Sequence, residues 1–282
     1  MQASGNTNRN NEKDSPFMLF EDSAEHGTDD TAAAHRPSWN FWVSNAGKTV
    51  RLTLIANHDR VCLSDIVPAA HRVCDIITRL AAEQLAESGK EISCKKGCAH
   101  CCSYMVSLSS AEAFYLQKHI HSLDAGTRRP IMHSFLRGAR TIAANKIPPV
   151  NTPDMDESQR LESISDWYQK MNIKCPFIVD NECSQYDARP LVCREHMVTS
   201  PPAGCRPFSG MFTKTVELPF STAEVLMEIS NHVESTLDEA ILLPLTMAWC
   251  NANTQRAQKK YPAALLAEKF IETVNAKTTA MA

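Results

Sequence analysis

Apolar side chains recur at helical spacing through most of the chain. From Asp65 to Glu87 they fall three or four positions apart, as on one face of an α-helix, and Gly89 follows where such a helix would end. Ser109 or Ser110, before an Ala-Glu-Ala-Phe-Tyr-Leu run, is typical of a capped helix start. Similar patterns predict further helices over residues 131–145, 154–171, 221–236, 239–251 and 263–275. We therefore expect a mainly α fold.

The N-terminal part of the chain has two other patterns. Residues 39–43 and 49–56 are rich in β-branched and aromatic side chains and are separated by Asn-Ala-Gly, which predicts a small β-hairpin. Residues 1–37 are mostly polar or small, so they bury too little apolar surface to offset the entropy of ordering. We expect a disordered tail over 1–37 and a single globular domain over 38–282.

The stretch from about 175 to 210 is rich in turn-forming residues. It contains Pro176, Pro190, Gly204, Pro207 and Gly210, which interrupt regular structure. Such an irregular segment needs a stabilising element other than a continuous core. We predict that it is cysteine-rich, metal-stapled structure, within a cysteine-cluster core at about 90–210.

Composition and charge narrow the classes of function. The 282 residues include 29 basic and 32 acidic side chains, a net charge of −3, so no global field would draw the chain to nucleic acid or anionic lipid. The first residues lack the pattern of a secretory signal, and no apolar run reaches the roughly 18 residues of a membrane span. We expect a cytoplasmic protein with no nucleic-acid or membrane partner.

Cysteine is the residue type that points to chemistry. The chain has 11 cysteines, and clustered thiols in a reducing compartment more often bind metal or do redox chemistry than form disulfides. The first cluster reads Cys94-Lys-Lys-Gly-Cys98-Ala-His-Cys101-Cys102. These spacings let a loop wrap around one ion or cluster edge, with Gly97 easing the turn. Cys101 and Cys102 point in different directions, so the loop folds back, they serve two centres, or one is a neighbouring or redox thiol.

A second cluster lies so much later in the chain that tertiary folding must bring the two together. It consists of Cys175, Cys183, Cys193 and Cys205. A zinc site takes four ligands and a [4Fe–4S] cluster takes four thiolates, so the eight cysteines fill one site with spares or two sites. His100 and His196 are candidate ligands of a mixed site. The expected cofactor is zinc or iron, including a [4Fe–4S] cluster.

Two structural interpretations compete with metal binding. Free cysteine is often a small buried hydrophobe, and a disulfide framework is possible only in an oxidising compartment. Four thiols within nine residues, and no visible targeting signal, make both interpretations weaker for the two clusters. Cys62, Cys74 and Cys250 lie in apolar, regular segments away from the clusters, so we expect them to be packing residues.

Basic residues flank the cysteines. Several thiolates on one centre leave it net negative, and nearby cations would compensate that charge and lower the thiol pKa values. The candidates are Lys95, Lys96, Lys174, Arg189, Arg194 and Arg206. Lys95 and Lys96 are better interpreted as facing water, whereas Arg189-Pro190 is typical of the start of a short helix that fixes the approach of Cys193.

Taken together, C-x3-C-x2-C-C followed by CPF-x5-C-S-x-Y-x2-RP-x2-CR resembles the YkgJ-type cysteine-cluster family, described as a zinc- or iron-chelating domain. The resemblance covers roughly residues 90–210. The chain is more distantly similar to the cysteine-rich part of flagellin lysine N-methylases, but the longer spacing and extra domains of those enzymes are not evident. The resemblance implies metal binding by Cys94, Cys98, Cys101, Cys102, Cys175, Cys183 and Cys193. Cys205 joins them by proximity.

We therefore predict a metal-binding protein that chelates zinc, iron or an iron–sulfur cluster, and we assign no catalytic residue. One alternative is an iron–sulfur enzyme that uses S-adenosylmethionine or resembles a methylase, because C-x3-C-x2-C is also the cluster spacing of radical enzymes. His100, where those enzymes have an aromatic residue, argues against it. Another alternative is a zinc-stapled adaptor with an unknown protein partner, docking on an apolar stripe over residues 225–233, although such stripes usually pack inward.

Overall fold

The computed structural model describes residues 15–22, 36–45, 47–148, 155–237 and 239–279. The elements in chain order are β1 (Phe17–Glu21), β2 (Ser38–Asn45), β3 (Lys48–Ala56), β4 (Arg60–Cys62), η2 (Leu63–Ile66), α1 (Val67–Glu87), β5 (Ser107–Leu108), α2 (Ser110–Ser122), α3 (Ala125–Ala144), α4 (Glu157–Lys170), β6 (Ile178–Val179), β7 (Glu182–Cys183), η3 (Tyr186–Ala188), α5 (Leu191–Glu195), η4 (Pro202–Cys205), α6 (Thr222–Glu234), β8 (Ile241–Leu242), η5 (Leu243–Leu245), α7 (Thr246–Ala252), α8 (Thr254–Gln258), β9 (Lys260–Pro262) and α9 (Ala263–Thr279). Helices dominate, and the mainly α prediction with a small N-terminal hairpin is confirmed.

The predicted hairpin forms part of a three-stranded antiparallel sheet with the order β1-β3-β2. Phe41 of β2 pairs with Leu52 of β3, and Trp39 pairs with Leu54. Side chains alternate between the two faces of a strand, so Phe41, Leu52 and Leu54 are fully buried while Trp42 is exposed. Gly47 in the connecting turn has a φ of 75°, a left-handed conformation that glycine adopts without steric cost.

The third strand corrects one prediction. β1 lies inside the range 1–37 that its polar composition marks as a disordered tail, yet Phe17 is buried and pairs with Ala56 of β3. The sequence Phe-Met-Leu-Phe-Glu is too short to stand out locally, and it is stabilised by hydrogen bonds to the edge of β3. Residues 1–14 and 23–35 of the predicted tail lie outside the described residues. The other residues of that range belong to β1 or flank β1 and β2.

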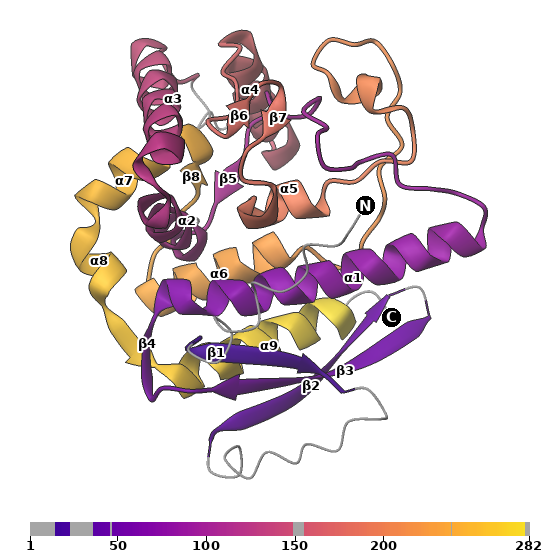
Figure 1. Cartoon of the computed structure of the whole chain (residues 1–282), viewed down its shortest axis with the longest axis vertical. Coiled ribbons are helices and arrows are strands. Elements are labelled where there is room, and N and C mark those ends of the chain that lie inside the picture. The colour runs from indigo at the N-terminus through magenta and orange to yellow at the C-terminus, as the bar shows by residue number, and fades with distance from the viewer. Residues whose placement is uncertain (1–14, 23–35, 46, 149–154, 238, 280–282) are drawn as a thin grey trace.

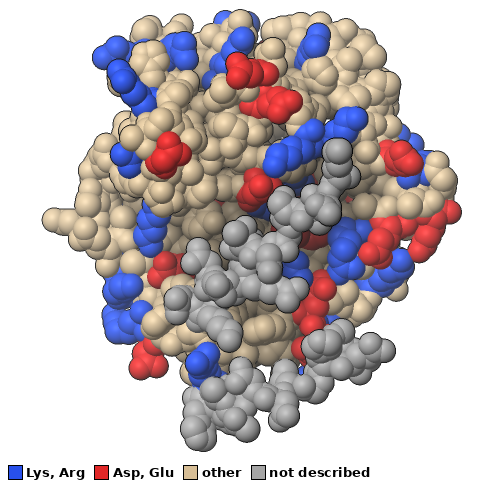
Figure 2. All heavy atoms as spheres, viewed as in Figure 1, with Lys and Arg blue, Asp and Glu red and all other residues tan. Residues whose placement is uncertain are grey.

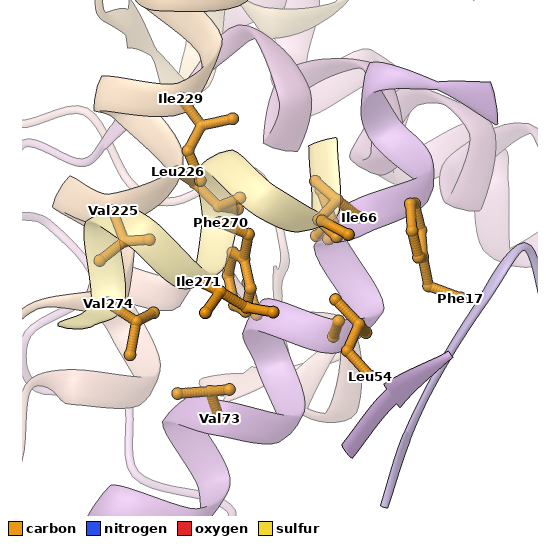
Figure 3. Packing of buried hydrophobic residues seen from close by; sticks show 14 of the residues in the cluster. Phe17, Leu54, Ile66, Val73, Val225, Leu226, Ile229, Phe270, Ile271 and Val274 are labelled. Carbon is orange, nitrogen blue, oxygen red and sulfur yellow. The ribbon is translucent and has the colours of Figure 1, made fainter. Parts of the chain in front are cut away.

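Helices α1, α6 and α9 build the largest hydrophobic core on one face of this sheet. Figure 1 shows α1 and α9 lying across the sheet, with α6 beyond them. Phe270 of α9 meets Phe41 of β2 edge to face, with ring centroids 6.2 Å apart. Figure 3 shows side chains of α6 and α9, among them Leu226 and Ile271, pointing toward one another and toward α1. The apolar stripe over 225–233 is therefore core for the most part: Val225, Leu226 and Ile229 are buried.

A second group of helices stands on the other side of α1 and positions the cysteines. Smaller apolar clusters join α2 to α3 and α7, and α3 to α4. Phe135 of α3 meets Phe177 edge to face, with ring centroids 5.5 Å apart. Because Phe177 lies two residues after Cys175, this contact holds the start of the second cysteine cluster against α3.

The helix predictions agree with the structure except near residue 240 and at the start of α3. The predicted helix over 239–251 is wrong in its first half, where β8 pairs with β5 and η5 carries Pro244 at its second residue. Proline lacks the N–H that a continuing helix needs, so the α-helix begins only at Thr246. α3 begins at Ala125, before the predicted start, with Asp124 accepting a hydrogen bond from the Thr127 backbone N–H.

The distribution of charged side chains on the described surface agrees with the small net charge. Figure 2 shows basic and acidic side chains interspersed across the visible face. No helix in the described ranges has both the length and the apolar character needed to cross a membrane.

Candidate metal centre

The first cysteine cluster lies in an irregular loop between α1 and β5. The backbone N–H of Cys98 donates to the carbonyl of Lys95 (3.0 Å), and that of Cys102 donates to the carbonyl of Ala99 (3.2 Å). Gly97 has a φ of 93°, a region that side chains rarely tolerate. The loop is therefore a succession of tight turns, and the role predicted for Gly97 is confirmed.

Cys183 of the second cluster lies in a short hairpin. β6 and β7 pair so that Ile178 lies opposite Cys183. Asp180 and Asn181 in the turn have φ values of 50° and 63°, as a two-residue type I′ turn requires, and Asn and Asp tolerate this conformation better than most residues. The turn residues thus fix the register that places Cys183.

Cys193 and Cys205 come from two further short helical turns. α5 begins directly after Pro190, as the sequence predicts, and the Cys193 N–H donates to the Pro190 carbonyl (3.0 Å). Cys205 ends η4 and is buried, with 4% of its surface exposed. Proline at the start of each turn restricts the backbone conformation there. The positions of Cys193 and Cys205 are therefore restricted as well.

Backbone hydrogen bonds join the two clusters. The N–H of Cys175 donates to the carbonyl of Cys102 (2.8 Å), and the N–H of Ser93 donates to the carbonyl of Val198 (2.8 Å). The Val198 N–H in turn approaches the sulfur of Cys94 at 3.3 Å. Figure 1 shows the loop after α1 rising to β7 and to the segment beyond α5. Folding therefore joins the two cluster-bearing segments by hydrogen bonds.

All eight cysteines contribute to one electrostatic environment. Burial raises the pKa of Cys193 well above its ordinary value, and negative charge on Cys175, Cys101 and Cys183 raises it further. Burial likewise raises the pKa of Cys205, with added contributions from Cys101, Cys94 and Cys98. The pKa of Cys102 is raised by its hydrogen bond to Cys101, by burial and then by Cys175 and Cys193. Thiols of both clusters thus lie close enough to oppose one another's ionisation.

Cys101 and Cys102 differ in acidity although they are adjacent. The hydrogen bond between the two thiols lowers the pKa of Cys101 to about 7, against the opposing effect of burial. The same bond raises the pKa of Cys102. The thiolate, and not the thiol, acts as metal ligand and nucleophile. Cys101 therefore forms a thiolate more readily than Cys102 and is the better metal ligand of the two.

The donor chemistry fits a thiolate-held metal. Converging cysteines are soft ligands that suit zinc, iron and iron–sulfur clusters, and a bound cation would offset the repulsion that raises these thiol pKa values. The side chains are not positioned as a finished ligand set: among the described residues, no group of three or more Cys, His, Asp or Glu is arranged to hold a metal ion. The cysteines therefore suit a metal in their chemical type and in the proximity of their two clusters. They do not define a coordination geometry.

The two candidate histidines differ in availability. The Nε–H of Arg206 donates to His100 Nδ1 (2.9 Å), so that lone pair is already used. His196 directly follows α5 and is exposed, and partial desolvation of its ring lowers its pKa. A neutral ring can ligate, but the structure brings neither histidine into a ligand group with the cysteines.

The flanking cations also separate into distinct environments. Arg194 lies 2.8 Å from the carboxylate of Asp75 and donates to the carbonyl of Arg189 (3.1 Å). Arg206 is exposed and bonded to His100. Lys95 and Lys96 are exposed, in agreement with the interpretation that they face water. Lys174 is exposed as well.

The three isolated cysteines are packing residues, as predicted. Cys74 and Cys250 have no exposed surface, and burial raises the pKa of each to about 12. Cys62 is buried at the end of β4. All eleven cysteines are free thiols.

Sequence reasoning missed Glu112, which connects α2 to the second cluster. Ser109-x-x-Glu112 has the sequence of a capping box, and Ser109 does accept the Glu112 N–H (3.2 Å). The Glu112 carboxylate instead accepts the N–H of Leu191, the first residue of α5, at 2.9 Å. Burial raises the pKa of Glu112 to about 7, although the Leu191 bond opposes the change. Apolar neighbours on both sides of Glu112 were the only sequence signal of its burial.

Glu112 lines a small, partly open pocket of about 10 Å³ together with His71 and Tyr115. Its second carboxylate oxygen is buried and has no hydrogen-bond partner within the described ranges. A cavity of this size admits about one water molecule. The carboxyl group is therefore a buried polar anchor for the helix that carries Cys193.

Comparison with protein-family models, with curated proteins and with solved structures found no match. The resemblance to the YkgJ-type family thus remains a prediction carried by the cysteine motifs.

Proposed function

We propose that this protein binds a metal through its split cysteine cluster, as zinc, iron or an iron–sulfur centre. The observation that carries the proposal is the convergence of two cysteine clusters distant in sequence. The Cys175 N–H binds the Cys102 carbonyl at 2.8 Å, and thiols of both clusters raise one another's pKa. Thiols that repel one another when ionised need a cation to be held together as thiolates.

The residues that would hold the metal are those of the two clusters. They are Cys94, Cys98, Cys101, Cys102, Cys175, Cys183, Cys193 and Cys205. Zinc would act as a structural staple, worth about 10–16 kcal/mol by analogy with zinc-finger peptides, whereas iron or an iron–sulfur centre would add electron transfer. In either case the turn-rich segment from 175 to 210 would gain the stabilising element that its short helices and strands do not supply.

The test is the metal and acid-labile sulfide content of the full chain purified without oxygen, with a visible absorption spectrum. Stoichiometric zinc without colour supports the structural centre. Iron with sulfide and absorbance near about 400 nm supports a cluster. Protein that holds neither metal, and takes up neither after incubation with zinc or with iron and sulfide, refutes the proposal.

Variants locate the centre. Cys98→Ala and Cys183→Ala, one in each cluster, should lower the metal content and the melting temperature. Cys62→Ala is the matched control, because Cys62 is a free cysteine outside both clusters. Equal metal content in all three variants would show that the metal is held elsewhere.

A further inference from the structure

The segment that follows Cys205 presents large apolar side chains to solvent. Phe208 and Phe212 are 82% and 85% exposed, and Met211 between them is 50% exposed. Both rings therefore stand nearly free of the rest of the described chain. Figure 1 shows this segment, in orange between α5 and α6, projecting at the edge of the molecule. We call residues 206–214 the apolar loop, and the three apolar side chains form its convex tip.

Hydrogen bonds within the segment hold the apolar loop in this conformation. Ser209 Oγ donates to the Gly204 carbonyl (2.9 Å) and accepts the Met211 N–H (3.2 Å). The Ser209 N–H in turn donates to the Arg206 carbonyl (3.1 Å). Phe208 has a φ of 58°, a left-handed conformation that bulky side chains rarely adopt and that is found most often at functional sites. The rings are thus presented to solvent by a hydrogen-bonded backbone.

Positive charge flanks the tip on both sides. Arg206 precedes the tip and Lys214 follows it, and both side chains are exposed. Residues 196–216 contain no acidic side chain. Neither cation forms an ion pair with a carboxylate of the described residues, and Arg206 donates instead to the His100 ring. The base of the apolar loop is therefore cationic.

This arrangement matches the chemistry of an anionic membrane surface. A bilayer has an apolar interior beneath a layer of polar headgroups, so an apolar tip with cations at its base can contact both at once. Such binding depends on the apolar area that is buried and on attraction to anionic lipids. A protein partner would need a pocket shaped to the convex tip, and two apolar loops meeting tip to tip would bring like charges together.

We propose that the apolar loop docks this protein on anionic phospholipid membranes, with its tip in the interface and its two flanking cations against the headgroup phosphates. The inference goes beyond metal binding and does not depend on it. The net charge of −3 gives the whole chain no attraction to such a surface, so the expectation of no membrane partner overlooks a local feature. Because Cys205 directly precedes the loop, docking would hold the end of the second cysteine cluster near the membrane.

The experiment measures cosedimentation of the reduced full chain with vesicles of phosphatidylcholine alone, or of phosphatidylcholine and phosphatidylglycerol in equal parts. We expect binding to the mixed vesicles, weakened by added salt. Phe208→Ser combined with Phe212→Ser should lower the partition coefficient at least about 10-fold, because two apolar rings no longer become buried. Arg206→Gln combined with Lys214→Gln should lower it about 30-fold on the mixed vesicles. Phe20→Ser is the matched control, because Phe20 is 46% exposed and lies on β1, outside the loop.

Three outcomes would overturn the inference. The first is a wild type that does not sediment with the mixed vesicles. The second is a double phenylalanine variant that binds them as well as Phe20→Ser does, because the membrane contact would then lie elsewhere. The third is equal binding to both kinds of vesicle, because headgroup charge would then play no part. Light scattering without vesicles tests the other occupant: a dimeric wild type that leaves vesicles unbound, and becomes monomeric in the double phenylalanine variant, would assign the loop to an interface between two copies. Circular dichroism of each variant shows whether the helices remain folded.

Discussion

Replacing Glu112 by glutamine should change how the stability of the protein depends on pH. Burial raises the pKa of Glu112 from 4.5 in the unfolded chain to about 7 in the folded protein. The folded state then binds more protons than the unfolded state between these values. The contribution of Glu112 is present below pH 4.5 and is lost as the pH rises through 7.

The size of the effect follows from that shift. Each pKa unit corresponds to about 1.4 kcal/mol, so the difference between pH 4.5 and 7 amounts to about 3 kcal/mol in the free energy of unfolding. Glutamine retains an oxygen that accepts the Leu191 N–H but carries no charge. The stability of Glu112→Gln relative to wild type should therefore increase by about 3 kcal/mol between pH 4.5 and 8.

His71 titrates in an overlapping range with the opposite sign. Burial, followed by the charges of Arg194 and His119, lowers the pKa of His71 from 6.5 to about 3. The unfolded state binds more protons in this interval, so the contribution of His71 is present above pH 6.5 and is lost as the pH falls toward 3. The variant and wild type both retain His71, and the difference between their curves isolates Glu112.

The assay is urea unfolding followed by tryptophan fluorescence at five pH values from 4.5 to 8.5, with chelator and reductant present. Glu268→Gln is the control, because Glu268 is exposed on α9. Wild-type and Glu112→Gln stabilities that stay parallel within about 0.5 kcal/mol, the usual scatter of surface substitutions, would refute the reasoning.

Three further predictions concern the core and the cysteines. Phe270→Ala should lower the free energy of unfolding by about 3–5 kcal/mol, because it removes a fully buried ring; a loss below about 1 kcal/mol in urea unfolding would contradict this. Gly138→Ala places a methyl group 2.8 Å from Pro244 Cβ, so thermal melting should show a loss of about 1–3 kcal/mol instead of the gain usual for a helical glycine. In metal-free reduced protein near pH 7, Cys101→Ser should slow alkylation by iodoacetamide more than Cys102→Ser does, and equal slowing would argue against the hydrogen-bonded pair.

Local patterns were sufficient to predict the long helices and the hairpin. α1 has buried residues at helical spacing from Val67 to Ala81, and β2 and β3 carry alternating apolar residues around a glycine turn. β1 could not be recognised in this way because its stability comes from pairing with β3, distant in sequence. The same holds for β8, whose two residues read as part of a helix until they pair with β5.

The proximity of the two cysteine-bearing segments was predictable, whereas the metal site itself stays a prediction. The cysteine spacing identifies the clusters, and their separation implies that folding brings them together. What spacing does not contain is how each flanking cation is held. Six cations flank the cysteines in sequence, but only side-chain geometry separates Arg189, stacked and without an ion pair among the described residues, from Arg194, paired with Asp75. The buried bond from Leu191 to Glu112 likewise joins residues 79 positions apart.

The separation of the two cysteine clusters has a consequence for synthesis in the cell. The bond between the Val198 N–H and the Cys94 sulfur spans 104 positions, and a ribosome adds about 5–20 residues per second. For roughly 5–20 s, therefore, the first four thiols have emerged while the last of their partners are still missing. Under the proposed function, the nascent chain would present an incomplete ligand set during that interval, and the timing of metal supply would bear on the yield of correctly assembled protein.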